Sequence, residues 1–289
     1  VNQPRVALIK DDYLLAGVSD GLQYGIKIVD ISDPPNARLA NLRQMDETPR
    51  GMSMDGNILA VSTNTMVQLW NVHSAGTPEY LSTIFPPASA TATGVSGKGL
   101  YIATGGNELL VYDISTASTP SLEETQVLTK SINDFTFYSE HMYLSCEDGI
   151  YYYSLDDAMS PLYLGLYSTP LEAMESVTQA HYLYIVTLDT LEIATLSDPS
   201  SPMKIGDVTV DATSDLSQIA VEGYYAYLQG DSSPVHAVYL WPHSSPTLID
   251  DIYTQRFISI FGASTDLLVN NGYLYGTTQY TGIRIHDLY

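Results

Sequence analysis

The sequence predicts an all-β protein, a seven-bladed β-propeller in which each blade is a four-stranded antiparallel sheet. Three observations lead to this fold class. A segment rich in β-branched and aromatic residues recurs seven times, a turn anchor recurs at steps of 41 to 44 residues, and a tight-turn signal separates the first two strands of each unit. Four short strands in a repeat of roughly forty residues are typical of propellers.

The recurring segment is clearest at residues 25–34, which read Gly-Ile-Lys-Ile-Val-Asp-Ile-Ser-Asp-Pro. Its copies begin at Met66, Glu108, Gly149, Leu191, His236 and Gly282. Each copy is short and dominated by residues that favour strands. No segment shows a sustained period of 3.6 residues, which excludes a helical fold. The copies therefore predict the third strand of each unit.

A turn anchor follows each of the first six copies, directly before a new apolar run. The anchors are Ala37, Pro78, Pro120, Pro161, Pro202 and Pro246, at spacings of 41, 42, 41, 41 and 44 residues. Proline suits this place because its fixed φ fits a turn, and its missing N–H is tolerated where a strand begins. The anchors predict where each fourth strand starts.

The second unit shows how one repeat is divided. Strands are expected at 51–54, 58–63, 66–72 and 79–84, with a tight turn at Asp55-Gly56. Gly, Asn and Asp supply the positive φ that two-residue hairpins require. Equivalent turns are expected at Asp11-Asp12, Gly97-Lys98, Glu140-His141, Ala180-His181, Glu222-Gly223 and Asn271-Gly272.

The repeats predict a single propeller domain over residues 1–289. Its units lie at approximately 4–43, 50–84, 93–127, 133–168, 175–210, 217–253 and 265–289. The last unit ends at the close of its third strand, so the last blade is expected to be three-stranded or to have its edge covered by something else. An unpaired edge invites strand addition from another chain, and a short protected edge is the alternative.

The segment Ile28-Val-Asp-Ile-Ser-Asp-Pro34 resembles the LVIVD-repeat propellers, a family found widely in bacterial and archaeal surface or secreted proteins. The resemblance extends over essentially the whole chain. It is sharp in the first unit, good in the third and fifth, and weakest in the sixth, where Trp241-Pro242-His243 replaces the Asp-Ile-Ser segment. The resemblance implies the fold and an extracytoplasmic setting, but no defined activity and no catalytic residue.

The charge is strongly one-sided, with 33 acidic and 11 basic residues and a net charge of −22. Such a surface repels phosphate backbones and anionic membranes, so we expect no nucleic-acid partner. No apolar run has the length of a membrane helix, which excludes membrane insertion by that route. Few lysines, 23 tyrosines and many hydroxyl residues favour an extracellular or cell-envelope protein, and a cytoplasmic one stays open.

Motifs of known chemistry are absent from the sequence. It contains no phosphate loop, no His-Glu-x-x-His, no Gly-x-Ser-x-Gly and no EF-hand loop, so we predict no cofactor, no metal site and no enzyme. The lone Cys146 lies in an apolar stretch and is expected to be a buried thiol. His141 and His181 occupy matching turns, too far apart to share a metal ion. Acidic turns such as Glu147-Asp148 are interpreted as side-chain caps, although Ca²⁺ binding in one of them stays open.

Departures from the repeat indicate where a partner could bind. The longest is residues 250–266, which carry Tyr253, Arg256, Phe257 and Phe261. Two further long loops are residues 230–235, with Asp231, and residues 19–25, with Tyr24. All three join strands at the same end of their blades, and the sixth, seventh and first units are neighbours in a ring. These loops therefore predict a protein or glycan site on one rim, whereas a longer outer strand or a packed loop is the alternative.

The starts of the innermost strands are expected to line the central opening. The residues near these starts are Arg5, Arg50, Thr93, Asp134, Glu175, Gln218 and Asp266. Two arginines and three acids could bind a small polar ligand, or hold channel water. Arg5 and Arg50 occur in matching Pro-Arg dipeptides, so they could jointly receive a carboxylate.

The sequence as a whole favours a non-catalytic binding or scaffold propeller outside the cytoplasm. Its tyrosine-rich surface suits a protein or a glycan, because aromatic faces bury area at low entropic cost. One alternative is a structural subunit of a larger extracellular surface assembly. The other is an enzyme with its active site in the central funnel.

Overall fold

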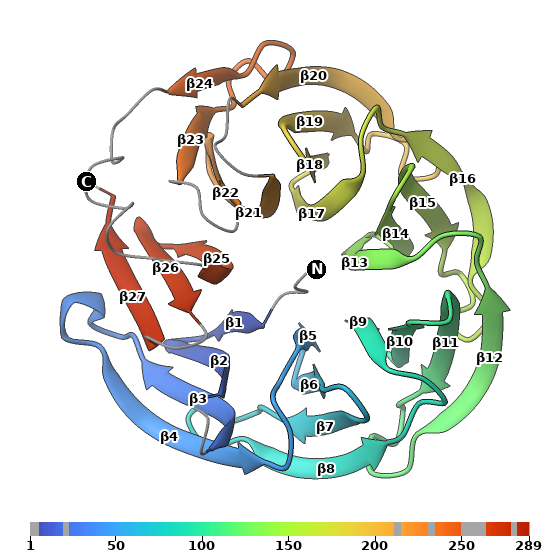
Figure 1. Cartoon of the computed structure of the whole chain (residues 1–289), viewed down its shortest axis with the longest axis vertical. Coiled ribbons are helices and arrows are strands. Elements are labelled where there is room, and N and C mark those ends of the chain that lie inside the picture. Colours follow the sequence, from blue (N-terminus) through green and yellow to red (C-terminus); the bar gives the residue numbers. More distant parts are fainter. Residues whose placement is uncertain are drawn as a thin grey trace. The chain divides into compact units, whose positions relative to one another are not determined.

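The computed structural model describes residues 6–19, 23–210, 215–230, 235–249, 264–278 and 282–288. It confirms the predicted fold class, an all-β seven-bladed propeller. Six of its sheets have four antiparallel strands, and the last sheet has three, β25-β26-β27 (Figure 1). In every sheet the strands lie side by side in sequence order, so each blade is a meander. The expected three-stranded last blade is therefore present among the described residues.

The strands of the first three blades have lengths of four to eight residues. They are β1 (Ala7–Lys10), β2 (Tyr13–Ser19), β3 (Tyr24–Asp30), β4 (Arg38–Met45), β5 (Gly51–Asp55), β6 (Ile58–Ser62), β7 (Val67–Asn71), β8 (Glu79–Ile84), β9 (Ala90–Ser96), β10 (Gly99–Thr104), β11 (Glu108–Asp113) and β12 (Ser121–Val127).

The remaining blades repeat this order. They consist of β13 (Ile132–Tyr138), β14 (His141–Cys146), β15 (Gly149–Ser154), β16 (Leu162–Ser168), β17 (Ala173–Gln179), β18 (Tyr182–Thr187), β19 (Thr190–Thr195), β20 (Met203–Thr209), β21 (Leu216–Glu222), β22 (Tyr225–Gly230), β23 (His236–Tyr239), β24 (Thr247–Ile249), β25 (Ser264–Asn270), β26 (Tyr273–Thr278) and β27 (Gly282–Asp287).

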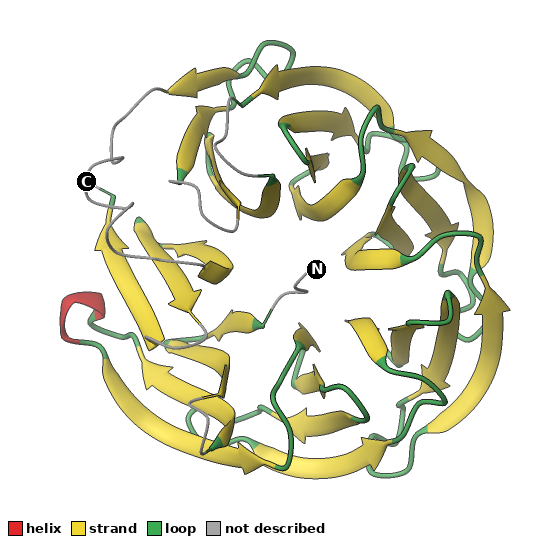
Figure 2. Cartoon of the chain, viewed as in Figure 1, coloured by secondary structure: helices red, strands yellow, loops and turns green. Residues whose placement is uncertain are grey.

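The proline anchors fix the outer strands as the sequence predicts. Each fourth strand begins directly after its anchor, as β8 does after Pro78 and β16 after Pro161. In the first unit, where alanine holds the anchor position, the turn before it forms a short 3-10 helix, η1 (Pro34–Asn36). This is the helix drawn in Figure 2, and the described residues contain no helix long and apolar enough to cross a membrane.

The tight turns agree with prediction to within one residue. Asp11, Gly97, Ala180 and Asn271 have positive φ at the first turn position, as expected for hairpins of this length. In three units the turn is shifted by one residue, to Gly56-Asn57, Ser139-Glu140 and Gly223-Tyr224. Strand pairing decides these positions, because Asp55 already pairs with Ile58 and Glu222 with Tyr225.

Two compact units divide the chain: Gln3–Asp134 with Leu155–Leu162, and Phe135–Ser154 with Tyr163–Tyr289. Within the first unit, the first strands β1, β5 and β9 are successive neighbours. Within the second unit, β17, β21 and β25 are likewise neighbours. Fourth strands such as β8 and β20 form the opposite edges of their sheets, the outer edges of the blades.

The core lies between neighbouring sheets. In the first unit, Leu69 of the second sheet is buried in one cluster with Leu100 and Leu110 of the third. In the second unit, Ile193 of the fifth sheet shares a cluster with Leu228 of the sixth. Both faces of an inner strand are thus covered, which is why these strands show no alternation of apolar and polar residues. Cys146 is fully buried, as predicted.

A buried tyrosine recurs as the third residue of the second strand in five blades. These residues are Tyr101, Tyr143, Tyr184, Tyr227 and Tyr275. The Tyr101 hydroxyl donates to the Ala158 carbonyl at 3.0 Å, and the Tyr143 hydroxyl donates to the Pro199 carbonyl at 2.8 Å. Each acceptor belongs to the turn that precedes the outer strand of the following blade. The tyrosines therefore tie successive blades together.

A second link joins the end of a first strand to the hairpin turn of the following blade. Asp55 accepts the Gly97 N–H at 2.6 Å, and Gln179 both accepts from the Gly223 N–H and donates to its carbonyl. Glu222 accepts the N–H groups of Asn271 and Gly272 at 2.7 and 3.0 Å. These three links occupy the last residue of β5, β17 and β21, so they repeat with the blade.

Candidate functional site

The loops that the sequence singled out lie largely outside the described residues. Tyr253, Arg256, Phe257 and Phe261 fall within 250–263, and Asp231 falls within 231–234, so the predicted rim site stays a prediction. Tyr24 is described and is the first residue of β3. It is half-buried and pairs with Ser19 and Met45 across the sheet.

The predicted funnel residues fall into two groups. Asp134, Glu175, Gln218 and Asp266 are each the third residue of a first strand, so they hold equivalent positions. Arg50 precedes β5 and is exposed, Thr93 is the fourth residue of β9, and Arg5 lies outside the described residues. Because side chains alternate along a strand, Thr93 does not share the orientation of the first group.

The two predicted funnel acids that belong to the second unit are buried, and each accepts a hydrogen bond from a backbone N–H group. Glu175 accepts the Ile219 N–H at 3.0 Å from the neighbouring first strand, and Asp266 accepts the N–H of Leu267 at 2.8 Å. A carboxylate used in this way satisfies backbone donors inside the sheet. Across the described residues, no group of three or more His, Cys, Asp or Glu is arranged to hold a metal ion.

The structure brings together an aromatic group that the sequence did not single out as a site. We call it the aromatic platform, and it consists of His181, Tyr182, His243, Trp241 and Tyr224. The rings follow one another in that order, with centroid separations of 4.2, 4.0, 5.9 and 5.9 Å. Tyr182 and His243 are stacked, with an interplanar angle of 16°, whereas Trp241 meets His243 edge-on.

Three turns of the second unit supply the platform. His181 lies in the β17–β18 turn, Tyr224 lies in the β21–β22 turn, and Trp241 and His243 lie in the turn before β24. Turns of this kind share one end of the blades, opposite to the end that carries the long loops. Trp241 and Tyr224 are the outermost members, each 56% exposed.

The platform exists because the sixth blade departs from the repeat. In three other blades the last residue of the third strand caps the following turn: Asp30 accepts the Ser32 N–H, Asn71 that of His73, and Asp113 that of Ser115. In the sixth blade this position is Tyr239, and the capped position is Trp241. The Asx cap is replaced by aromatic side chains, and the Trp241-Pro242 bond is cis.

His243 is held from both sides. Its Nε2 lies 3.0 Å from the Tyr184 hydroxyl, and its ring stacks on Tyr182, which in turn contacts His181. Burial, and to a lesser extent the nearby His181, lower the pKa of His243 below the ordinary 6.5. The ring is therefore neutral at pH 7 and presents an uncharged hydrogen-bonding edge.

The sequence shows that Trp241-Pro242-His243 departs from the repeat, but it does not show that this segment lies near His181. The two histidines are 62 positions apart, and His181 was compared with His141 instead. The available signal was an aromatic residue, Tyr239, at the position where the first three copies of the repeat have Asp or Asn. What it could not supply is the three-dimensional neighbourhood of turns from adjacent blades.

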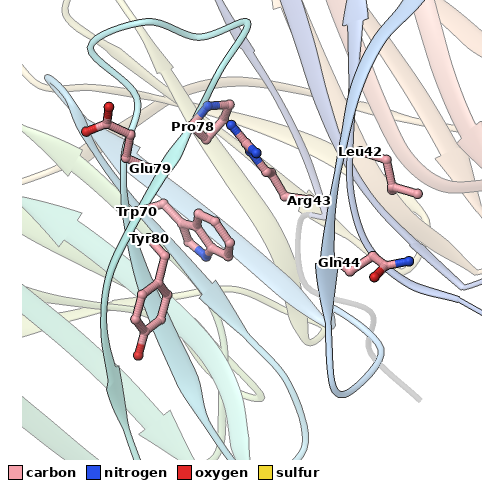
Figure 3. A pocket seen from close by; sticks show the side chains of 7 residues that line it. All are labelled: Leu42, Arg43, Gln44, Trp70, Pro78, Glu79 and Tyr80. Atoms are coloured by element: carbon pink, nitrogen blue, oxygen red, sulfur yellow. The ribbon is translucent and has the colours of Figure 1, made fainter.

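A second feature lies in the first unit, between the outer edges of the first and second blades. We call it the outer groove, a pocket of about 590 Å³ lined by Leu42, Arg43, Gln44, Trp70, Pro78, Glu79 and Tyr80. Figure 3 shows Leu42, Arg43 and Gln44 on one strand, with the Arg43 side chain reaching toward Pro78, which directly precedes β8, and the Leu42 and Gln44 side chains on the other side of that strand. Trp70 and Tyr80 form an edge-to-face pair at 5.6 Å.

The family comparison supports the resemblance inferred from the sequence. Residues 89–127 match the model of the LVIVD repeat. The matched segment contains the four strands β9 to β12 of the third blade, rather than the first unit, in which the motif is easiest to see. No curated protein sequence matches the chain.

Several solved structures share the fold at low sequence identity. A protein from Lactobacillus plantarum superimposes with a TM-score of 0.74 at 12% identity, over 96% of this chain and 92% of that one. The Cps50 (Swd1) β-propeller domain of Myceliophteria thermophila has a TM-score of 0.72 at 12% identity, over 99% and 98%. BamB from Moraxella catarrhalis has a TM-score of 0.67 at 13% identity, over 99% and 95%. At these identities the likeness concerns the fold alone.

Proposed function

We propose that this chain, a seven-bladed propeller that carries an LVIVD repeat, is a non-catalytic binding module that works outside the cytoplasm and engages a glycan. The observation that carries the proposal is the aromatic platform. Trp241 and Tyr224 together expose two large rings, and Trp241 lies edge-on to His243. Exposed aromatic groups rimmed by polar residues mark interaction sites.

The chemistry of the platform favours a sugar over a protein surface. Trp241 and Tyr224 are pre-positioned by edge-on and tilted contacts with neighbouring rings, so an exposed ring face can cover the apolar face of a pyranose at little entropic cost. The neutral His243 and the exposed His181 supply hydrogen-bonding groups for hydroxyls at the margin. With a net charge of −22, the chain repels polyanions at long range, which favours a neutral oligosaccharide.

Binding to an oligosaccharide array tests the proposal. We expect the full chain to bind neutral oligosaccharides, and the Trp241→Ala and Tyr224→Ala variants to lose about tenfold or more in affinity, as hot-spot aromatics do. Phe85→Ala is the matched control, because Phe85 is 73% exposed and lies outside the platform. Wild-type binding that all three variants retain would refute the platform, and binding only to a protein partner would refute the glycan.

A second candidate function rests on the three-stranded last blade. In the other six blades a fourth strand pairs with the third, whereas β27 is the last strand of its sheet among the described residues. We propose that another chain can add a strand there, so that the protein serves as a subunit of an extracellular surface assembly. A strictly monomeric native protein, with amide exchange of β27 as slow as that of β26, would refute this role.

A further inference from the structure

Beyond the proposed function, we propose that the outer groove is a second, independent binding site, which takes a carboxylate carried on a six-membered sugar ring. The chemistry is that of a hexuronic acid residue. The site belongs entirely to the first unit and uses none of the platform residues. Its volume of about 590 Å³ lies within the range of small-molecule sites.

Two unused donors point to an anionic acceptor. The Arg43 Nε and the Trp70 Nε1 are both buried, and neither meets an acceptor within the described chain. Trp70 itself is only 6% exposed, so its indole N–H cannot simply turn into solvent. Buried donors in proteins normally have a hydrogen-bond partner. Two unpaired N–H donors at the wall of a groove therefore indicate where an acceptor from a ligand could bind.

Arg43 sets the class of ligand. A guanidinium presents its Nε and Nη donors as a planar fork that matches a carboxylate. In a chain with three acids for every basic residue, Arg43 still forms no ion pair with any described acid, including Glu79 in the opposite wall. Its charge is therefore available to a ligand that enters between the two outer strands (Figure 3).

Tyr80 supplies the aromatic surface on which the ring of the ligand would pack. Tyr80 is 54% exposed, and it is held by its edge-to-face contact with Trp70 and by a 2.9 Å hydrogen bond between its hydroxyl and Thr83. A fixed, accessible ring that lines the same groove as this guanidinium suits the face of a sugar ring that carries an acid group. Gln44 and Glu79 also line the groove, and both are exposed.

Tryptophan fluorescence isolates this site, because the chain has only two tryptophans and one lies in each candidate site. In a Trp241→Phe chain, Trp70 is the sole reporter. We expect sodium glucuronate to change its emission saturably, and glucose to leave it unchanged. Sodium benzoate provides the second arm: a stronger response to benzoate than to glucuronate would identify a free aromatic acid, rather than a uronate, as the preferred source of the carboxylate.

Substitutions at Arg43 decide the outcome. In the same background, Arg43→Met retains the apolar stem, and we expect at least about tenfold weaker glucuronate binding. Arg43→Lys retains the charge without the planar fork, and its affinity for glucuronate should lie between those of the parent chain and Arg43→Met. Arg38→Met is the matched control, because Arg38 is exposed and pairs with Asp30 away from the groove. The proposal is overturned if glucose acts like glucuronate, if no ligand gives saturation, or if Arg43→Met binds as well as the parent while its thermal unfolding is unchanged. Loss of platform binding in the array would leave this result unaffected.

Discussion

At the scale of single residues, the hydroxyl groups of buried tyrosines connect neighbouring blades. Tyr101 and Tyr143 each bury a large ring between sheets and place one polar atom at a turn carbonyl of the following blade, whereas the Tyr184 hydroxyl meets the His243 ring. A buried tyrosine usually finds a partner in this way, since an unpaired hydroxyl would be costly. The same residue therefore contributes both apolar burial and a defined register between neighbours.

Removing one such hydroxyl should measurably destabilise the chain. We expect Tyr101→Phe to lower the free energy of unfolding by about 1–2 kcal/mol, because the Ala158 carbonyl loses its donor. Tyr80→Phe is the control, since it removes an exposed hydroxyl and should cost less than about 0.5 kcal/mol. Urea unfolding of the two variants gives the comparison, and equal losses would show that the buried bond contributes nothing special.

Alkaline pH provides a second residue-scale test. Burial raises the pKa of Tyr275 from 10.0 to about 12 and raises those of Tyr101, Tyr143 and Tyr184 as well. The folded state holds these protons more tightly than the unfolded state. The stabilisation that the tyrosines provide in this way is therefore complete below pH 10 and is lost as the pH rises toward 12. We expect the urea midpoint to fall between pH 10 and 12, and to fall less in Tyr275→Phe. A midpoint that is constant up to pH 11.5 would contradict the assignment.

At the scale of elements, the blades are equivalent in their strands and unequal in their turns. Anchors, hairpins and third strands follow from local rules, so the sequence predicts strands 51–54 and 79–84 almost as they occur at β5 and β8. The one-residue shifts at Gly56 and Gly223 arise from cross-strand pairing, which no local signal encodes. The platform needs turns from two adjacent blades, and for that reason it was not predicted.

Gly149 shows how tightly one turn is packed. It begins β15 with a φ of +136°, and a Cβ atom there would lie 2.1 Å from the Tyr167 carbonyl oxygen of β16. We expect Gly149→Ala to cost about 3 kcal/mol or more, because both the backbone conformation and the space exclude it. Gly106→Ala is the control, with its nearest neighbour at 3.6 Å. Thermal unfolding measures both, and a Gly149→Ala chain as stable as the control would disprove the close approach.

At the scale of the whole molecule, charge dominates the solution behaviour. Thirty-three acids face 11 basic residues, so even complete pairing would leave two thirds of the acids without a cation. Most of the negative charge is thus not offset by nearby cations. Self-repulsion of this kind destabilises a compact state and is screened by salt.

Salt should therefore stabilise the protein. We expect Tm to rise by roughly 2–3 °C when NaCl increases from about 10 mM to about 0.5 M at pH 7, corresponding to about 1–2 kcal/mol. The increment should shrink as the pH approaches the sequence pI of about 4.2, where the net charge is small. A Tm that falls with salt at pH 7 would mean that ion pairs, rather than repulsion, govern the stability.

The fold class and the three-stranded last blade were predictable from the repeat, since both follow from the copies of one motif. Function was less accessible. Residues 250–263 of the candidate loop lie outside the described residues, whereas Trp241 and His243 lie where the sequence departs from the repeat, and their partners, Tyr182 and His181, belong to another blade. The turn before β24 is one of the places where a blade departs from the repeat, and that departure is the basis of the proposed function.

Emission from Trp241 tests the central claim most directly. In a Trp70→Phe chain, Trp241 is the only tryptophan and is 56% exposed. Titration with the neutral oligosaccharide that binds best on the array should shift its emission to shorter wavelength and saturate, because the sugar covers the ring and displaces water. The shift should disappear when Tyr224→Ala removes the adjacent ring. If the oligosaccharide binds the chain while the Trp241 emission stays unchanged, the platform is not the glycan site.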